Sequence, residues 1–306
     1  MARKPAHLGG MRPAVISAEY ERLLEEVRPT SELWRLALGV AIILATYLVV
    51  AMVILMTADN LGAFGIGGVH RGPVSLLVLL LTFPGLALGS VLAVLILHRR
   101  DPQGLLGRNF ARFRGDFTVA STITLTGQVV SLAVGFLIFA PVASLPVAIW
   151  AMWVVPVLAL ILMQSAAEEL VFRGYLQQQL AARFRSRWIW WVAPSVLFGL
   201  LHYDTQVYGP NAWLVVLDTM LIGLIAADLT ARTGNLGAAV GLHFTNNAVV
   251  LLFVALQGDL SGMALHVTPF SAADHSMMRL ALGGDVVLFG GGYAVYLWIM
   301  GRWGRA

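Results

Sequence analysis

The sequence predicts an all-α protein, a polytopic transmembrane bundle of about eight helices. Of its 306 residues, 58% are hydrophobic and only 12% are charged, whereas a typical soluble domain carries about 25% charged residues. Several apolar runs reach the roughly 18 residues that a helix needs to cross a bilayer. The 20 Lys and Arg residues gather in alternate gaps between these runs, which is typical of a multi-pass membrane protein.

The composition also excludes several classes of function. The chain has no cysteine, so disulfides, thiolate metal ligands and a cysteine nucleophile are all excluded. The net charge is +4, and a basic balance can indicate a nucleic-acid partner. Here the arginines cluster between apolar runs, so membrane topology accounts for them. We therefore expect the lipid bilayer as a partner and no nucleic acid.

Residues 1–33 are predicted to form a cytoplasmic tail with a short amphipathic helix. Its first 16 residues are basic but no apolar run follows them directly, so no cleavable signal peptide is expected. In the segment 19–28, four apolar residues recur at i, i+3, i+4 and i+7, which indicates one apolar helix face. These residues are Tyr20, Leu23, Leu24 and Val27. We expect this helix to end at Pro29 and to lie on the membrane surface.

Residues 34–306 are predicted to form a single transmembrane domain with eight spans. Five runs are long enough by length alone: Leu36–Met56, Val74–Leu97, Phe117–Ala140, Val142–Ala167 and Leu236–Leu256. Three are shorter or interrupted: Trp188–Leu201, Ala212–Ala227 and Val286–Met300. Pro84 and Pro156 are expected to kink their helices. No internal repeat is visible, which disfavours a small-solute transporter.

The distribution of basic residues predicts the orientation. The segment before the first run holds six Lys or Arg residues, and the alternate gaps that begin with it hold 18 of the 20. Because cytoplasmic loops carry the excess of Lys and Arg, an eight-span chain with this pattern has both termini in the cytoplasm.

Polar residues inside the apolar runs are concentrated in three segments. A carboxylate or guanidinium at the centre of a bilayer costs about 2.5–3.5 kcal/mol on insertion scales, so such residues are expected to be paired or functional. The segments are QSAAEELVFRGY (164–175), LFGLLHY (197–203) and GLHFTNN (241–247).

The first segment gives two adjacent glutamates different surroundings. Neighbouring residues on a helix point about 100° apart, so Glu168 and Glu169 face different directions. Arg173 lies four residues after Glu169, where the two side chains are expected to pair. Glu168 is then free to act as a general base or acid. The simpler alternative is an acidic helix end at the interface with a snorkelling arginine.

The other two segments contribute two histidines and an asparagine. His202 lies one helical turn after Phe198, and His243 and Asn247 share one face at i, i+4. Two donors on one stripe suit a developing oxyanion, although helix–helix hydrogen bonding, worth about 0.6 kcal/mol per contact, explains each residue separately. Taken together, the three segments predict peptide-bond hydrolysis by an activated water, without a nucleophilic side chain.

These segments resemble the motifs of the CAAX protease and bacteriocin-processing family of intramembrane proteases, also called CPBP or Abi. The family pattern is EExxxR, then FxxxH, then HxxxN. In this sequence the three motifs read Glu168-Glu169 to Arg173, Phe198 to His202, and His243 to Asn247. The resemblance covers roughly residues 160–250 and implies a catalytic core at about 142–256, within the eight-span architecture of the family.

The resemblance implies a glutamic endopeptidase and a role for each motif residue. Glu168 is expected to activate water with the assistance of His202, while His243 and Asn247 stabilise the oxyanion. The residues expected to support them are Glu169, Arg173 and Phe198. The resemblance further implies a membrane-anchored protein or peptide substrate and a multi-pass location in a bacterial inner membrane. The preference for Arg over Lys is typical of a GC-rich bacterial genome.

Two alternatives remain open. Glu168, His202 and His243 are residue types that bind zinc, and they would then make a zinc-dependent intramembrane metalloprotease. The sequence lacks the HExxH pattern that places two zinc ligands on one helix, and the resemblance implies metal-free water activation, so no cofactor is favoured. A non-proteolytic immunity or scaffold protein would keep the same fold, but it would have no need of Glu168.

Overall fold

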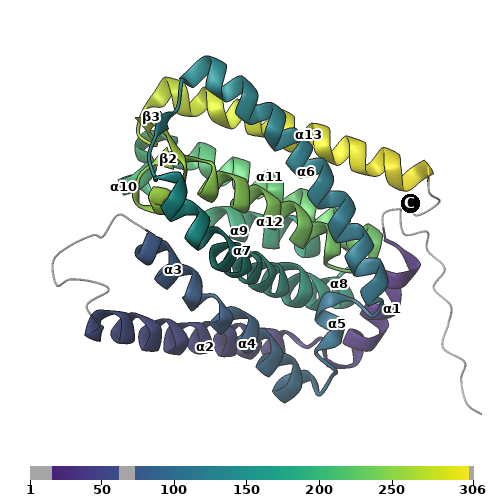
Figure 1. Cartoon of the computed structure of the whole chain (residues 1–306). Coiled ribbons are helices and arrows are strands. Elements are labelled where there is room, and N and C mark those ends of the chain that lie inside the picture. The colour runs from purple at the N-terminus through teal and green to yellow at the C-terminus, as the bar shows by residue number, and fades with distance from the viewer. Residues whose placement is uncertain (1–15, 62–72, 303–306) are drawn as a thin grey trace, which may run out of the picture.

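The computed structural model describes residues 16–61 and 73–302 (Figure 1). The predicted tail residues 1–15 and the basic residues Arg71 and Arg305 lie outside the described part. The described chain is a bundle of helices with one small three-stranded sheet at one end. The all-α fold class is therefore confirmed.

The helices follow the predicted apolar runs in order. They are α1 (Ala18–Val27), η1 (Arg28–Thr30), α2 (Leu33–Asn60), α3 (Pro73–Thr82), α4 (Pro84–Ala93), η2 (Val94–His98), α5 (Gln103–Leu106), α6 (Phe110–Phe139), α7 (Val147–Glu169), η3 (Leu170–Gln177), α8 (Gln178–Arg183), η4 (Trp188–Val192), α9 (Ala193–Leu200), α10 (Thr205–Tyr208), η5 (Gly209–Asn211), α11 (Ala212–Thr233), α12 (Gly237–Leu252), η6 (Asp259–Met263) and α13 (His275–Arg302).

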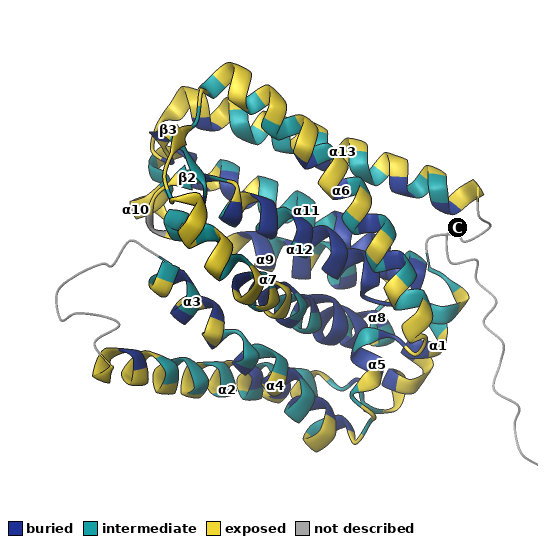
Figure 2. Cartoon of the chain, viewed as in Figure 1, coloured by how far each residue is buried: buried dark blue, intermediate teal, exposed yellow. Residues whose placement is uncertain are grey.

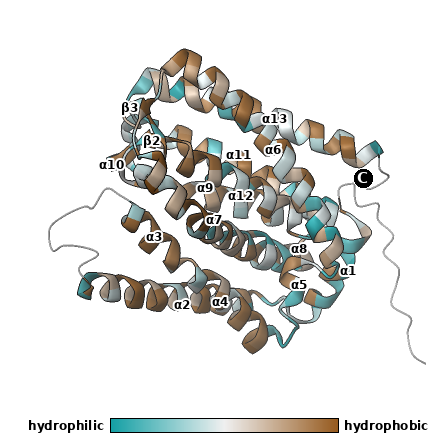
Figure 3. Cartoon of the chain, viewed as in Figure 1, coloured by the Kyte–Doolittle hydropathy of each residue, from teal (hydrophilic) through white to brown (hydrophobic). Residues whose placement is uncertain are grey.

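Within the described residues, six helical segments are long and apolar enough to cross a membrane. They are Leu33–Asn60, Pro73–His98, Pro102–Phe139, Val147–Arg183, Thr205–Thr233 and His275–Arg302. Two shorter apolar helices, Trp188–Leu200 and Gly237–Leu252, lie at the positions of the fifth and seventh predicted spans. Hydrophobic residues predominate along the outer helices (Figure 3), and Leu137 of α6 and Val287 of α13 are 87% and 75% exposed. Lipid rather than water is the solvent that such surfaces require.

Proline shapes two of the spans. The second run is divided at Phe83, where α3 ends and α4 begins with Pro84, because proline has no N–H to continue the hydrogen bonds of the preceding turn. Pro156 lies inside α7, which continues on both sides of it.

The seventh predicted span is shorter than its apolar run. The helix α12 ends at Leu252, and the apolar residues that follow form strand β2 (Val254–Gln257). Strand β3 (His266–Ser271) pairs in parallel with β2 and antiparallel with β1 (Val142–Ala143). The predicted run Leu236–Leu256 is therefore wrong at its end, because these apolar residues pair with β3 instead of extending the helix. The fourth run likewise begins as β1.

The N-terminal helix forms as predicted but contacts the protein. Ser17 caps α1 by accepting a hydrogen bond from the Tyr20 backbone N–H at 3.1 Å. The four apolar residues of its face are at most 2% exposed. Three of them, Tyr20, Leu23 and Leu24, belong to one cluster with Ala181, Trp190 and Ala231. The expectation that this face lies on the membrane surface is therefore wrong, since α8, η4 and α11 bury the same apolar area.

The buried face of α1 makes a stability prediction. We expect Leu24→Ala to lower the free energy of unfolding by about 2–5 kcal/mol, because a fully buried leucine loses its packing and leaves a cavity. Chemical unfolding in detergent and the rate of limited proteolysis near α1 would measure the change. The neighbouring exposed Glu25→Ala is the control. Equal stability of the two variants would contradict the burial of α1.

Close helix contacts bring the three motif segments together. A Cβ on Gly241 of α12 would lie 2.5 Å from the Phe117 backbone oxygen of α6, and one on Gly199 of α9 would lie 2.5 Å from the Val216 oxygen of α11. These glycines therefore allow α6 to approach α12 and α9 to approach α11. α12 also packs along α7, and buried residues concentrate in this central group of helices (Figure 2).

Candidate active site

The two glutamates of the first motif lie at the end of α7. The chain continues directly as the π-helical segment η3, which carries Arg173. π-Helical turns are rare and frequently occur at functional sites. The first motif therefore spans the junction of two helix types inside one long apolar segment.

The predicted Glu169–Arg173 pair is present and buried. Arg173 Nη1 donates to Glu169 Oε1 at 2.9 Å, and the two side chains are 2% and 1% exposed. Arg173 Nη2 also donates to the Gly223 carbonyl at 3.1 Å, and its guanidinium carbon lies 4.7 Å from the Phe198 ring centroid. The pair thus joins η3 to α9 and α11.

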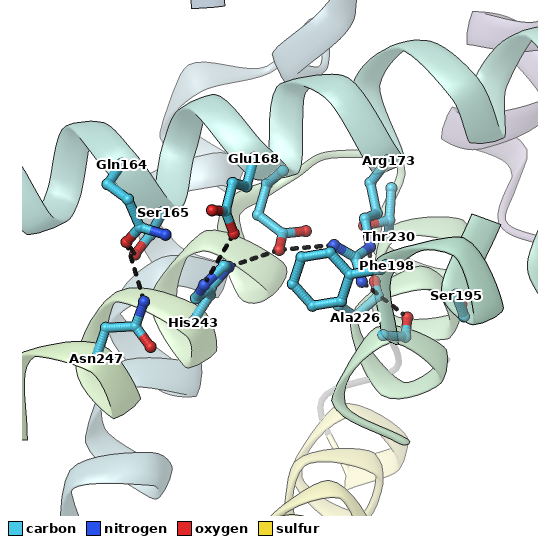
Figure 4. Close-up of polar contacts among 12 residues, drawn as sticks. Gln164, Ser165, Glu168, Arg173, Ser195, Phe198, Ala226, Thr230, His243 and Asn247 are labelled. Atoms are coloured by element: carbon cyan, nitrogen blue, oxygen red, sulfur yellow. Dashed lines mark hydrogen bonds and ion pairs between the residues drawn. The ribbon is translucent and has the colours of Figure 1, made fainter. Parts of the chain in front are cut away.

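His243 contacts both glutamates through its two ring nitrogens, and Figure 4 shows its ring turned toward Glu168. Its Nδ1 is 2.9 Å from Glu169 Oε1, and its Nε2 is 3.5 Å from Glu168 Oε2. Because an ionised carboxylate only accepts hydrogen bonds, Nδ1 carries a proton and donates it to Glu169. The second nitrogen then faces Glu168. The paired carboxylate of Glu169 thus orients the imidazole toward the unpaired one.

Phe198 separates the two histidines. Its buried ring lies edge-on to the rings of His202 and His243, with centroid distances of 5.1 and 5.9 Å. His202 Nδ1 donates to the Phe198 carbonyl at 2.9 Å, so Nε2 of the neutral ring is an acceptor. In the part of the chain that the structure describes, the histidine within 4 Å of Glu168 is His243, and no ion pair joins His202 to Glu168.

Asn247 contacts a residue that the motif analysis did not include. Its Nδ2 donates to Gln164 Oε1 at 2.9 Å, which joins α12 to α7 one turn before Glu168. Gln164 also accepts a hydrogen bond from Ser165 at 3.2 Å. The signal for Gln164 in the sequence is its position four residues before Glu168 inside an apolar run, because i and i+4 lie on one helix face.

The described residues do not form a metal-binding cluster. Over 16–61 and 73–302, no group of three His, Asp or Glu side chains is placed to hold a metal ion. Nδ1 of His243 and Nδ1 of His202 each donate to oxygen atoms of the protein. Nε2 of each neutral ring is therefore the nitrogen that can accept a proton or bind a ligand.

The fold and the site define a multi-pass membrane protein with a buried cluster of carboxylates and imidazole. Residues 148–249 match the model of the family described as type II CAAX prenyl endopeptidase Rce1-like, and this segment contains all three motifs. The expected resemblance to CAAX proteases is confirmed over these residues.

A curated relative matches part of the chain. The uncharacterized protein YyaK of Bacillus subtilis (strain 168) is 27% identical over 105 residues, which cover 34% of this chain and 35% of that protein. The matched part thus spans about a third of the length of that relative. No solved structure matches the chain.

Proposed function

We propose that this protein is an intramembrane endopeptidase that hydrolyses peptide bonds of membrane-anchored proteins. The family match over 148–249 supports this class of activity. The observation that carries the proposal is the Glu168 carboxylate, which makes no hydrogen bond through its buried Oε2 within the described residues and lies 3.5 Å from His243 Nε2. It stands on an apolar helix of a bundle whose outer faces are apolar.

Glu168 is the proposed general base. Its Oε2 is buried, makes no hydrogen bond within the described residues and faces His243 Nε2 at 3.5 Å, so this oxygen can accept a hydrogen bond from the attacking water. Glu168 takes one proton from the attacking water while the water oxygen bonds to the scissile carbonyl carbon. When the C–N bond breaks, the same proton passes to the leaving amine, and the products are a carboxylic acid and an amine.

The remaining motif residues orient the reaction. Asn247 has a second N–H that its bond to Gln164 does not use, and His243 in its protonated form donates from Nε2. Both are proposed donors to the oxyanion of the tetrahedral intermediate. Glu169 and Arg173 hold His243 in place, and we propose that Nε2 of His202 assists proton transfer from the side of Phe198.

We propose that water activation is metal-free. Cleavage by the purified protein is then expected to stay within about twofold of its initial rate after exhaustive treatment with a zinc chelator, because carboxylate and imidazole carry the proton transfers. Metal content measured on the same sample provides the control for chelation. Activity lost to the chelator and restored by zinc would contradict this prediction and support the metalloprotease alternative.

The substrate and topology are proposed from the family and the charge pattern. A CAAX-type activity acts near the C-terminus of a membrane-attached protein. The alternating arginines support eight spans with both termini in the cytoplasm, and we propose a bacterial inner membrane as the location. The visible start of α1 and the end of α13 lie at the same end of the bundle (Figure 1), which supports an even number of crossings.

Mass spectrometry of membrane-protein C-termini tests the activity directly. Cells that carry the gene, lack it, or carry Glu168→Gln should be compared. We expect truncated C-termini only with the wild-type gene, and full-length precursors in the other two strains. If the wild-type strain had the same full-length C-termini as the strain that lacks the gene, the endopeptidase proposal would be wrong and the non-proteolytic scaffold would be favoured. If the Glu168→Gln strain matched the wild type, a group other than Glu168 would activate the water.

A further inference from the structure

A chain of amide side chains crosses the bundle and ends beside Glu168. Gln128 of α6 donates from Nε2 to Asn246 Oδ1 at 2.7 Å. Asn246 Nδ2 donates to Asn247 Oδ1 at 3.3 Å, and Asn247 Nδ2 donates to Gln164 Oε1 at 2.9 Å. The chain therefore links α6, α12 and α7 through side chains in apolar helices.

The direction of these hydrogen bonds leaves one donor group unused. Each amide accepts through its oxygen and donates onward through its nitrogen, so the chain ends at Gln164. Its Oε1 accepts from both Asn247 and Ser165, which fixes the plane of the amide. Its Nε2 carries two hydrogens, and within the described residues no hydrogen bond from this nitrogen is recorded. The side chain itself is only 7% exposed.

This unused donor lies on the catalytic side of α7. Gln164 precedes Glu168 by four residues, so the two side chains share one helix face. Figure 4 shows the amide oxygen of Gln164 turned toward Asn247 and the amide nitrogen on the side of Glu168. A donor that no group of the described protein uses is available to a ligand or to water.

We infer that Gln164 is a catalytic residue that donates an N–H to the oxyanion formed at the scissile carbonyl. The inference rests on the proposed endopeptidase function and extends its site by one residue. As the water oxygen bonds to the carbonyl carbon, the C=O electron pair moves onto the oxygen. Gln164 stabilises that charge through a hydrogen bond and transfers no proton. Asn247 positions Gln164 in addition to contributing its own second N–H.

Preorganisation explains why a Gln164 amide held by other hydrogen bonds is an effective donor. A donor held before the reaction begins does not have to reorient as charge develops, and in a site of low dielectric its effect is larger than in water. The hydrogen bonds from Asn247 and Ser165 hold the Gln164 amide in this manner, and the contacts from Gln128 and Asn246 hold Asn247 in turn.

The test compares two variants of the full chain in liposomes, Gln164→Met and Gln128→Met, each of which replaces a side-chain amide with a thioether. The probe is an internally quenched farnesylated peptide that ends in a Cys-aliphatic-aliphatic-X sequence. We expect Gln164→Met to lower kcat about 10²–10³-fold, as loss of one oxyanion donor does, with KM changed less than about threefold. Gln128→Met is the matched control, since it removes a polar amide from the same chain and keeps the Gln164 donor. We expect it to lower kcat less than about tenfold.

A double-mutant comparison separates catalysis from structure. Asn247→Ala and Gln164→Met together are expected to cost much less than the product of their separate effects on kcat, because Asn247 acts partly through Gln164. Gln164→Asn keeps the amide but shortens it, so it serves as a second variant if Gln164→Met folds poorly. Two results would overturn the role of Gln164 and leave the endopeptidase function standing. One is a folded Gln164→Met protein with the kcat of the wild type, and the other is an equal loss of kcat in Gln164→Met and Gln128→Met. Absence of cleavage of the peptide by the wild-type protein would overturn the proposed function itself.

Discussion

Replacing Glu168 with glutamine is expected to lower kcat by about 10³–10⁴-fold without changing the stability of the protein. The amide has nearly the shape of the carboxylate but cannot take a proton from water, and general base catalysis contributes typically 10²–10⁴-fold. Glu168 makes no hydrogen bond through Oε2 within the described residues, so its replacement breaks few structural contacts. Cleavage of the farnesylated peptide in liposomes and the thermal unfolding midpoint would measure both parts of the prediction.

The control for this experiment is Glu25→Gln, which makes the same change on the exposed side of α1. It is expected to retain full activity and full stability. A Glu168→Gln protein with kcat within about threefold of the wild type would show that another group activates the water. A Glu168→Gln protein that fails to insert would instead show that this carboxylate is structural.

Arg173→Met is expected to have the largest effect on stability, lowering the free energy of unfolding by about 3–5 kcal/mol. The guanidinium is the partner of the fully buried Glu169 carboxylate, and removal of one member of a buried ion pair leaves an uncompensated charge. His243 is then expected to lose its fixed orientation, because Glu169 would no longer be held in place. Unfolding in detergent and the yield of folded protein would measure the loss.

Two further variants make this prediction specific. The double variant Glu169→Gln with Arg173→Met removes both charges, so it is expected to recover most of the lost stability while activity stays low. Arg22→Met breaks the Arg22–Glu19 pair, which is 3.6 Å apart and whose arginine is 71% exposed, and it is expected to cost less than about 1 kcal/mol. If Arg173→Met cost no more than Arg22→Met, the buried pair would not stabilise the fold.

Most of the helical segments were predictable because their signals are local. Apolar run length and the position of Pro84 are properties of short stretches, and they predicted the apolar helices in their order and the break in the second one. The spacing of Glu169 and Arg173 at i, i+4 predicted their ion pair for the same reason. Each of these features depends on one helix and its own backbone.

Features that involve a second helix were predicted less well. The apolar face of α1 contacts α8, η4 and α11 rather than lipid. A helix that packs on protein and a helix that lies on a membrane have the same amphipathic periodicity, so the sequence pattern does not distinguish them. The end of the seventh run pairs with β3 as strand β2, because an apolar stretch of four residues suits a strand as well as a helix. In both cases the partner lies far away in the sequence.

The candidate site divides in the same way. The sequence by itself determined the membrane-spanning character of the chain, the three motifs and the Glu169–Arg173 pair, since composition and short spacings encode them. Only the tertiary structure decided that His243 rather than His202 lies against Glu168 and that Asn247 bonds to Gln164. Those contacts depend on how closely α12 packs along α7, and side chains on several helices set that distance together.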